Sequence, residues 1–191
     1  MGVALGRFGT NTIMLERRKR VGEINRGDAL QLAAVRSLDR LGVLEPLLQA
    51  GAVITKTVSF SHYRKGRLGG FHTPDLFDPP HNTLLTLSHE RIESTLIEEA
   101  QGRGIVMRRG HAVRKIRREG DRMILSVAAE EGDYELHTRL VIGADGKFST
   151  VRTFFGEEPD TYWYEQECVV VEAENPDGVP AELRMARADA H

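Results

Sequence analysis

The feature that most constrains the fold is a short apolar run that leads, through two glycines and an acid, into a helix. Residues 140–142 (Leu-Val-Ile) form the run, and Gly143 and Gly146 bracket Asp145. β-Branched and aliphatic runs of this length fill buried parallel strands. We therefore predict a parallel strand over 140–142 in an α/β fold, with a ligand bound near the carboxyl end of that strand.

The residues that follow extend this turn to the pattern D-G-x-x-S-x-x-R, which ends at Ser149 and Arg152. Ser149 and Arg152 are one helical turn apart, so both can face the same side. Gly146 lets the backbone approach a ligand closely. Polar groups in this arrangement can surround a diphosphate or a ribityl chain. The alternative is an ordinary strand-to-helix turn in which Asp145 caps the helix.

A second strand is predicted near the start of the chain, where residues 12–18 form an apolar run that reaches an acid, Glu16. Gly9 is expected to end a helix over about residues 2–8. A carboxylate at the tip of such a strand can accept hydrogen bonds from ribose hydroxyls. The alternative is a solvated strand end, where Glu16 only neutralises the basic run 17–20. A G-x-G-x-x-G phosphate turn is absent, because Gly2 and Gly6 fall inside the predicted helix.

With these motifs in this order, the chain resembles the flavoprotein aromatic hydroxylases, which share the para-hydroxybenzoate hydroxylase fold. The resemblance implies that Asp145, Gly146 and Arg152 contact FAD, close to the path of the nicotinamide cofactor. It also implies that Glu16 binds the ribose of FAD, with Arg17 beside it. The implied fold is a Rossmann-like FAD-binding domain with a small antiparallel meander and parts of an antiparallel substrate-binding sheet.

Two further candidates rest on the same resemblance. Arg26 precedes a predicted helix in the pattern R-G-x-x-L-Q, where family members contact the FAD diphosphate or ribityl chain. The alternative is a helix-start arginine compensated by Asp28. His89 occupies a position where relatives carry an arginine or glutamine that touches FAD. Histidine is shorter, so Arg91 can serve instead, and an ordinary solvated first turn is the alternative for both.

The order of predicted elements suggests four segments. Residues 1–53 are the first segment of the FAD-binding domain, without its glycine-rich turn, and 54–83 are a substrate-sheet insertion that contains a hairpin. Residues 84–158 return to the FAD-binding domain, with a strand, a helix, a parallel strand at 105–107 and an antiparallel meander. Residues 159–191 begin a substrate-binding domain, so the chain resembles a family member cut at both ends.

The resemblance implies an NAD(P)H-dependent flavin monooxygenase that hydroxylates an aromatic or related ring with O2, through a flavin hydroperoxide. The flavin carries this chemistry, so no side chain is assigned as catalytic. Two other interpretations stay open, the first of them because the phosphate turn is absent. One is a non-catalytic remnant or interaction module, and the other is a halogenase, reductase or oxidase of the same fold.

The composition limits the remaining classes of protein. The chain has 191 residues, 40% of them hydrophobic, and a formal net charge of −2, which permits a folded core and gives no reason to expect a nucleic-acid partner. We expect a cytoplasmic protein with no membrane span. A single cysteine excludes an internal disulfide, and the seven histidines are scattered, so no metal site is predicted.

Overall fold

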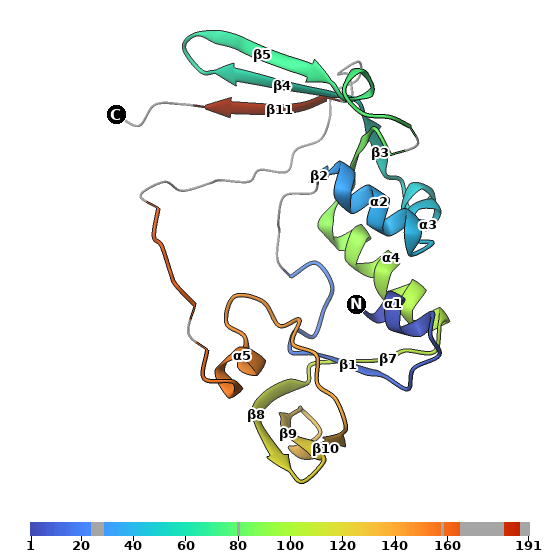
Figure 1. The fold of residues 1–191 in the computed structure, drawn as a ribbon, viewed down its shortest axis with the longest axis vertical. Helices are drawn as coiled ribbons and strands as arrows, with labels where there is room; N and C mark the ends of the chain where they lie inside the picture. The colour runs from blue at the N-terminus through green and yellow to red at the C-terminus, as the bar shows by residue number, and fades with distance from the viewer. Residues whose placement is uncertain (24–28, 80, 158, 165–181, 188–191) are drawn as a thin grey trace. The chain divides into compact units, whose positions relative to one another are not determined.

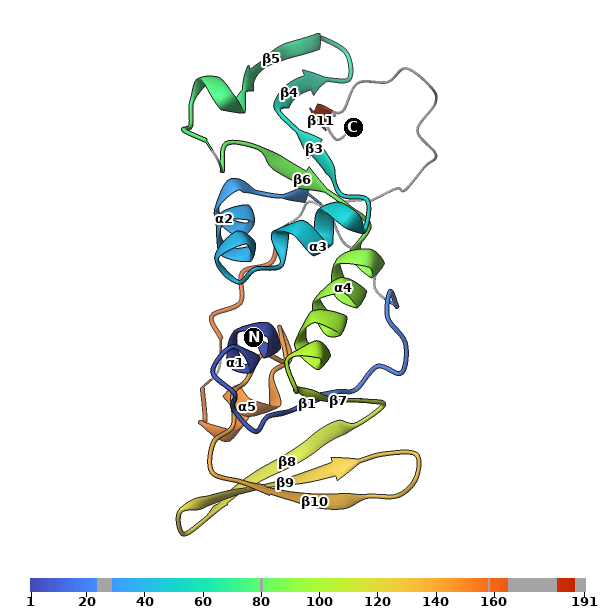
Figure 2. The ribbon, with the colours of Figure 1, turned by 90° about the vertical axis from the view of Figure 1, so that its right-hand side faces the viewer.

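A computed structural model describes residues 1–23, 29–79, 81–157, 159–164 and 182–187 (Figures 1 and 2). The chain divides into two compact units, which we describe separately. The first unit consists of residues 1–23 and 97–169, and the second of residues 24–96 and 170–191. Within the described residues, no helix is long and apolar enough to cross a membrane.

The first unit is built on two parallel strands, β1 (Ile13–Glu16) and β7 (Val106–Arg109). They run side by side in Figure 1, with Ile13 opposite Val106 and Glu16 opposite Arg109. The predicted strands at 12–18 and 105–107 are thus confirmed. The helix α1 (Gly2–Gly6) precedes β1, and Gly9 follows it with φ of +61°, a conformation that favours glycine.

Two glycines let α1 pack closely on its neighbours. A methyl group at Gly2 would collide with Met14 Sδ and lie 3.2 Å from Ala100 Cβ. A methyl group at Gly6 would lie only 2.6 Å from Arg103 Cβ. Both glycines therefore serve helix packing inside α1, as expected of residues outside a phosphate turn.

An antiparallel meander completes the first unit, with strands β8 (Ala112–Glu119), β9 (Arg122–Ala128) and β10 (Tyr134–Thr138) in the order β10-β9-β8. The predicted meander is confirmed. Ile116, Leu125 and Val127 form its buried core. The short helix α5 (Thr150–Phe154) packs against this core through Val151 and Phe154.

The strand predicted at 140–142 does not form in the described residues. Val141 packs partly buried against the meander core, but Leu140 is 71% exposed and Ile142 is 45% exposed. None of the sheets formed by the described strands includes this segment. A strand needs a neighbour for its backbone hydrogen bonds, so an apolar run alone does not produce one.

The second unit contains a small antiparallel sheet and the helices around it. Strands β2 (Ala29–Leu30), β6 (Leu84–Thr86) and β3 (Val53–Thr55) pair in the order β2-β6-β3. Three helices accompany them: α2 (Leu32–Arg40), α3 (Leu44–Gln49) and the first part of α4 (His89–Gly102). Leu47, Leu87 and Ile92 form the core. The helix predicted after Arg26 and the helix predicted within residues 84–158 are confirmed, as α2 and α4.

The predicted hairpin is also confirmed, as β4 (Thr57–His62) and β5 (Gly66–His72), followed by a single 3₁₀ turn, η1 (Thr73–Asp75). Strand β11 (Glu182–Arg187) pairs with β4 in parallel. The structure therefore has the predicted mixed α/β architecture. The four domain segments inferred from the sequence stay a prediction.

Candidate functional site

The loop before α5 is organised by the Asp145 carboxylate. Its Oδ1 accepts a hydrogen bond from Ser149 Oγ at 2.5 Å, and its Oδ2 accepts from the backbone N–H of Thr150 at 2.7 Å and of Val151 at 3.3 Å. Asp145 thus bonds the first residues of α5, whose N–H groups have no partner inside the helix. The structure therefore shows the helix cap that the sequence suggested as the alternative role of Asp145.

The other residues of the motif hold the same loop. Ser149 is the N-cap of α5, and its Oγ accepts a hydrogen bond from Arg152 N at 3.0 Å. The Arg152 guanidinium donates to the carbonyl of Lys147 at 2.5 Å. Gly146 has φ of +78°, which a residue with a side chain adopts only with strain. All four fixed positions of D-G-x-x-S-x-x-R therefore shape the loop.

The environment of Asp145 favours its charged form. Burial by itself raises the pKa of this carboxyl, but hydrogen bonds from Ser149 and from the backbone of Val151 and Thr150 outweigh burial, so the pKa lies below its usual value. Asp145 is consequently a carboxylate at neutral pH, with most of its acceptor positions directed to its own loop.

An open pocket of about 530 Å³ lies over this loop and α5. Its lining includes three of the predicted cofactor residues, Asp145, Gly146 and Arg152. Gly143 also lines it and packs tightly on α5, because a methyl group at Gly143 would lie 2.7 Å from Val151 Cβ. The structure thus brings the motif residues together at one surface.

Glu16 lies at the end of β1, where the sequence predicted a ribose-binding acid. Its Oε1 accepts a hydrogen bond from Arg18 N at 2.9 Å. No other hydrogen bond to this carboxylate occurs in the part of the chain that the structure describes. The second oxygen of Glu16 therefore keeps its capacity to accept hydrogen bonds from a ligand.

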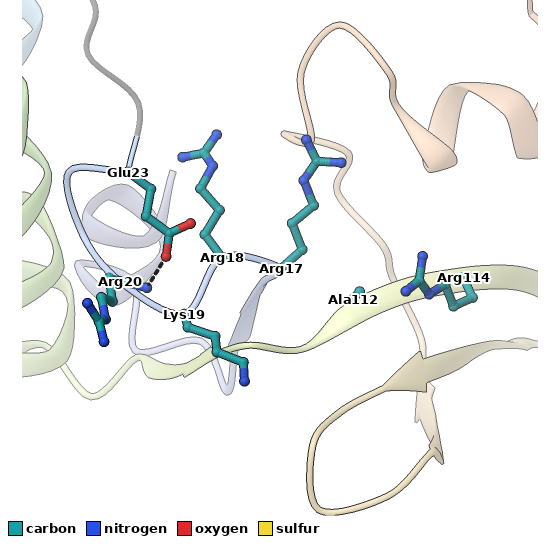
Figure 3. A pocket seen from close by; sticks show the side chains of 7 residues that line it. All are labelled: Arg17, Arg18, Lys19, Arg20, Glu23, Ala112 and Arg114. Atoms are coloured by element: carbon teal, nitrogen blue, oxygen red, sulfur yellow. Dashed lines mark hydrogen bonds between the residues drawn. The ribbon is translucent and has the colours of Figure 1, made fainter.

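The loop after Glu16 forms a second, strongly basic pocket of about 730 Å³ (Figure 3). Glu23 is the acid of this pocket, and its carboxylate accepts from Arg20 N at 2.7 Å. Lys19 Nζ lies 2.6 Å from Glu130 of the meander, and this carboxylate raises the pKa of Lys19. The lining cations are Arg17, Arg18, Lys19, Arg20 and Arg114.

Arg17 therefore lines a different pocket from Asp145, although both belong to the first unit. His89 is the first residue of α4 in the second unit, and the guanidinium of the nearby Arg91 donates to Ala50 O at 3.2 Å. Arg26 lies outside the described residues.

Two residues that line these pockets, Ser149 and Arg114, were not predicted to be site residues. Ser149 was part of the motif, and its spacing from Asp145 and Arg152 is the spacing of a cap. Arg114 reaches the basic pocket from β8, and nothing in its local sequence distinguishes it from the other arginines of that strand.

Comparison with known proteins places the chain in a family. A family model described as an FAD binding domain matches residues 1–181. The chain therefore belongs to this family of FAD-binding domains, and FAD is the cofactor that its family binds.

Several of the curated relatives are named as monooxygenases. The 12-dehydrotetracycline 5-monooxygenase/anhydrotetracycline 6-monooxygenase of Streptomyces rimosus is 30% identical over 151 residues, which cover 78% of this chain and 28% of that protein. The rifampicin monooxygenase of Streptomyces venezuelae is 28% identical over 148 residues, covering 78% of this chain and 29% of that protein. The chain thus spans less than a third of the length of these two relatives.

Solved structures show the same fold. An anhydrotetracycline hydroxylase from Streptomyces rimosus matches with a TM-score of 0.70 and 28% identity, over 81% of this chain and 30% of that chain. A p-nitrophenol 4-monooxygenase from Pseudomonas putida matches with a TM-score of 0.73 over 81% of this chain and 40% of that chain. Its identity of 22% supports the fold alone.

Proposed function

We propose that this chain binds FAD through its first unit and that the whole protein is an NAD(P)H-dependent monooxygenase acting on aromatic or related rings. The observation that carries the proposal is the family match over residues 1–181, combined with the placement of Glu16 and the Asp145 loop in one compact unit. Glu16, Arg17, Gly146 and Arg152 are the proposed contacts in that unit, and Asp145 is proposed to hold the loop of the cofactor site in shape.

These residues fit FAD chemically. Glu16 ends a parallel strand with one carboxylate oxygen still able to accept, which suits ribose hydroxyls. Above Gly146 there is open space, since a methyl group there would have no neighbour within 4 Å. A ligand can therefore approach the backbone of the loop. Asp145 and Ser149 would hold that loop in shape, and Arg17 adds positive charge near the end of β1.

FAD, when bound, supplies the redox chemistry with O2 and the nicotinamide reductant. The role of the chain's own residues is to bind and orient the cofactor. For His89, in the second unit, and for Arg26, outside the described residues, contact with FAD stays a prediction. A cytoplasmic location stays a prediction.

Titration of the chain with FAD, followed by quenching of flavin fluorescence, tests cofactor binding. Glu16→Gln keeps the acceptor for Arg18 N but removes the charge. We expect a loss of affinity of about ten- to a hundredfold, the value of hydrogen bonds to a charged acceptor. Glu119→Gln, at the exposed end of β8, is the matched control and should bind FAD as the unchanged chain does. Absence of quenching at any FAD concentration would refute the proposal.

The activity of the whole protein is tested separately, by measuring the oxidation of NADH and of NADPH under ¹⁸O₂. Anhydrotetracycline and rifampicin are suitable probes, because the curated relatives are named for these ring compounds. We expect a hydroxylated product that carries one ¹⁸O atom. Bound FAD that neither nicotinamide reduces would refute the enzymatic part of the proposal and leave a flavin-binding module.

A further inference from the structure

The corner between β7 and β8 holds the loop that begins at Glu16. The backbone N–H of His111 donates to the carbonyl of Glu16 at 3.0 Å, and that of Gly110 donates to the carbonyl of Arg18 at 3.1 Å. The Glu16 carboxylate in turn accepts from Arg18 N at 2.9 Å. The end of β1 is thus fixed between its own side chain and this corner, so the position of the corner determines where Glu16 lies.

The side chain of His111 joins the same corner to the meander. Its Nδ1 lies 3.1 Å from the hydroxyl oxygen of Tyr134, the first residue of β10. The two rings meet edge to face, with centroids 5.7 Å apart and an interplanar angle of 71°. Tyr134 packs partly buried against the meander core, as Leu15 of β1 does. The tyrosine therefore connects the corner to the buried core of the first unit.

Arg108 fixes the direction of the hydrogen bond between Tyr134 and His111. Its guanidinium donates to the Tyr134 hydroxyl oxygen at 3.3 Å and lies 5.8 Å from the centre of the ring. A guanidinium has donors only, so the tyrosine oxygen accepts from it and keeps its own O–H available. The neutral His111 ring can accept that O–H through Nδ1. All three side chains are half-buried, so water competes less for these bonds than at the surface.

Protonation of His111 would reverse this arrangement. A protonated ring carries a hydrogen on both nitrogens, so Nδ1 can no longer accept from Tyr134. Two cationic groups, His111 and Arg108, would then point at one hydroxyl oxygen and repel each other. Histidine side chains are the ones that ordinarily change charge between about pH 5 and 8. The bond to Tyr134 is therefore sensitive to pH in that range.

The other charged groups on the segments around this corner are directed elsewhere. Among the described residues, no carboxylate forms an ion pair with His111. A charge on its ring is therefore not offset by a paired anion. Glu16 accepts from Arg18 N, Lys19 lies 2.6 Å from Glu130, Glu135 lies 2.6 Å from Arg117, Arg109 donates to the carbonyl of Arg20, and Arg18 and Arg114 line the basic pocket.

We infer that Tyr134 is a positioning residue for Glu16, that it acts through His111, and that it holds the end of β1 most firmly while His111 is neutral. The inference rests on the proposed function only in what Glu16 binds, the ribose of FAD. Its consequence is that the affinity for FAD falls when His111 takes up a proton. The proton then acts through two side chains that are not among the proposed cofactor contacts.

Amide hydrogen exchange, measured by NMR on the full chain without FAD, tests the corner itself. The protection of the Gly110 and His111 amides, corrected for intrinsic exchange, should fall about three- to tenfold between about pH 8 and about pH 5. The midpoint of this change should equal the midpoint of the His111 ring, read from its own carbon and nitrogen shifts. Protection that does not follow the charge of His111 would overturn the inference.

His111→Asn separates the position of the side chain from its charge. The asparagine oxygen takes the place of Nδ1, so it can accept from Tyr134 but does not titrate. In this variant we expect the two amides to be about as well protected at pH 5 as at pH 8. His137→Asn, at an exposed position on β10, is the matched control and should change with pH as the unchanged chain does. A full change with pH in His111→Asn would contradict the role of His111.

Tyr134→Phe removes the hydroxyl and keeps the ring on the meander core. Both the His111 amide protection and the FAD affinity should fall about three- to tenfold at pH 8, the value of one hydrogen bond, and should no longer follow the charge of His111. Amide protection equal to that of the unchanged chain would overturn the inference. If the unchanged chain does not bind FAD, the proposed function fails, and the exchange measurements still decide whether Tyr134 positions Glu16.

Discussion

The hydrogen bond between Ser149 and Asp145 yields the most direct test of how the D-G-x-x-S-x-x-R loop works. Ser149 is only 8% exposed, and it both donates to Asp145 and accepts from Arg152 N. Asp145 lines the pocket and joins Ser149 to the start of α5. If Asp145 acts by holding the loop, the loss of Ser149 should weaken FAD binding as the loss of Asp145 does.

The expected magnitudes follow from these contacts. Ser149→Ala removes an N-cap, which costs about 1 kcal/mol in the free energy of unfolding. Asp145→Ala removes a charged acceptor with three donors and should cost about 2 kcal/mol, a modest value because the residue is exposed. The double variant should lose about 1 kcal/mol less than the sum, because both single changes break the same bond.

Urea unfolding followed by far-UV circular dichroism measures these energies. The pKa of Asp145 is lowered in the folded chain, so its stabilising effect is present above the pKa of the unfolded chain. The effect should decline as the pH falls below about 4, through the folded pKa.

Two results would refute this account of the loop. Energies of Asp145→Ala and Ser149→Ala that add fully in the double variant would mean that the two side chains are not coupled. An unchanged FAD affinity in Ser149→Ala, together with a weakened one in Asp145→Ala, would mean that Asp145 binds the cofactor directly.

Three further predictions concern packing. Gly143→Ala should cost about 1–3 kcal/mol by overpacking, since the new methyl group would lie 2.7 Å from Val151 Cβ, and thermal unfolding measures the loss. Gly6→Ala should lower Tm, because the new methyl group would collide with Arg103. Gly102→Ala is the control, and it should leave Tm unchanged or raise it, since its methyl group would have no neighbour within 4 Å. Equal Tm values for the two variants would contradict the packing of α1. Leu47→Ala, at a side chain with 0% exposure in the second unit, should cost about 2–5 kcal/mol by circular dichroism, and a loss below about 1 kcal/mol would mean that this core is loose.

The sequence predicted the elements whose neighbours lie within the chain. The meander formed as expected because glycines at 120 and 132 turn between strands that pair with each other. Strand β1 formed because β7 supplies its backbone hydrogen bonds. The run at 140–142 has the same apolar character, but no described strand pairs with it. The strand predicted from its composition therefore lacks the backbone hydrogen bonds that would form it.

The arrangement of the candidate site residues could be predicted from the sequence only where their hydrogen-bond partners are close in the chain. Asp145, Ser149 and Arg152 are fixed by bonds within seven residues, which the spacing of the motif encodes. Arg114 joins the basic pocket from a strand far along the chain from Arg17, so only the fold brings these cations together.

Capping and cofactor binding are not exclusive roles for the D-G-x-x-S-x-x-R motif. The spacing that suggests a flavin site is also the spacing that lets Asp145 and Ser149 cap α5, so the pattern alone does not separate the two roles. A cap holds the loop in one conformation, and a loop that is already fixed loses less entropy when a ligand binds. Gly146 then leaves its backbone accessible, because no described residue lies within 4 Å of the position that a Cβ would take there. Under the proposed function, Asp145 would contribute to binding chiefly by ordering the loop, and Ser149, which is only 8% exposed, is then the more informative residue to change.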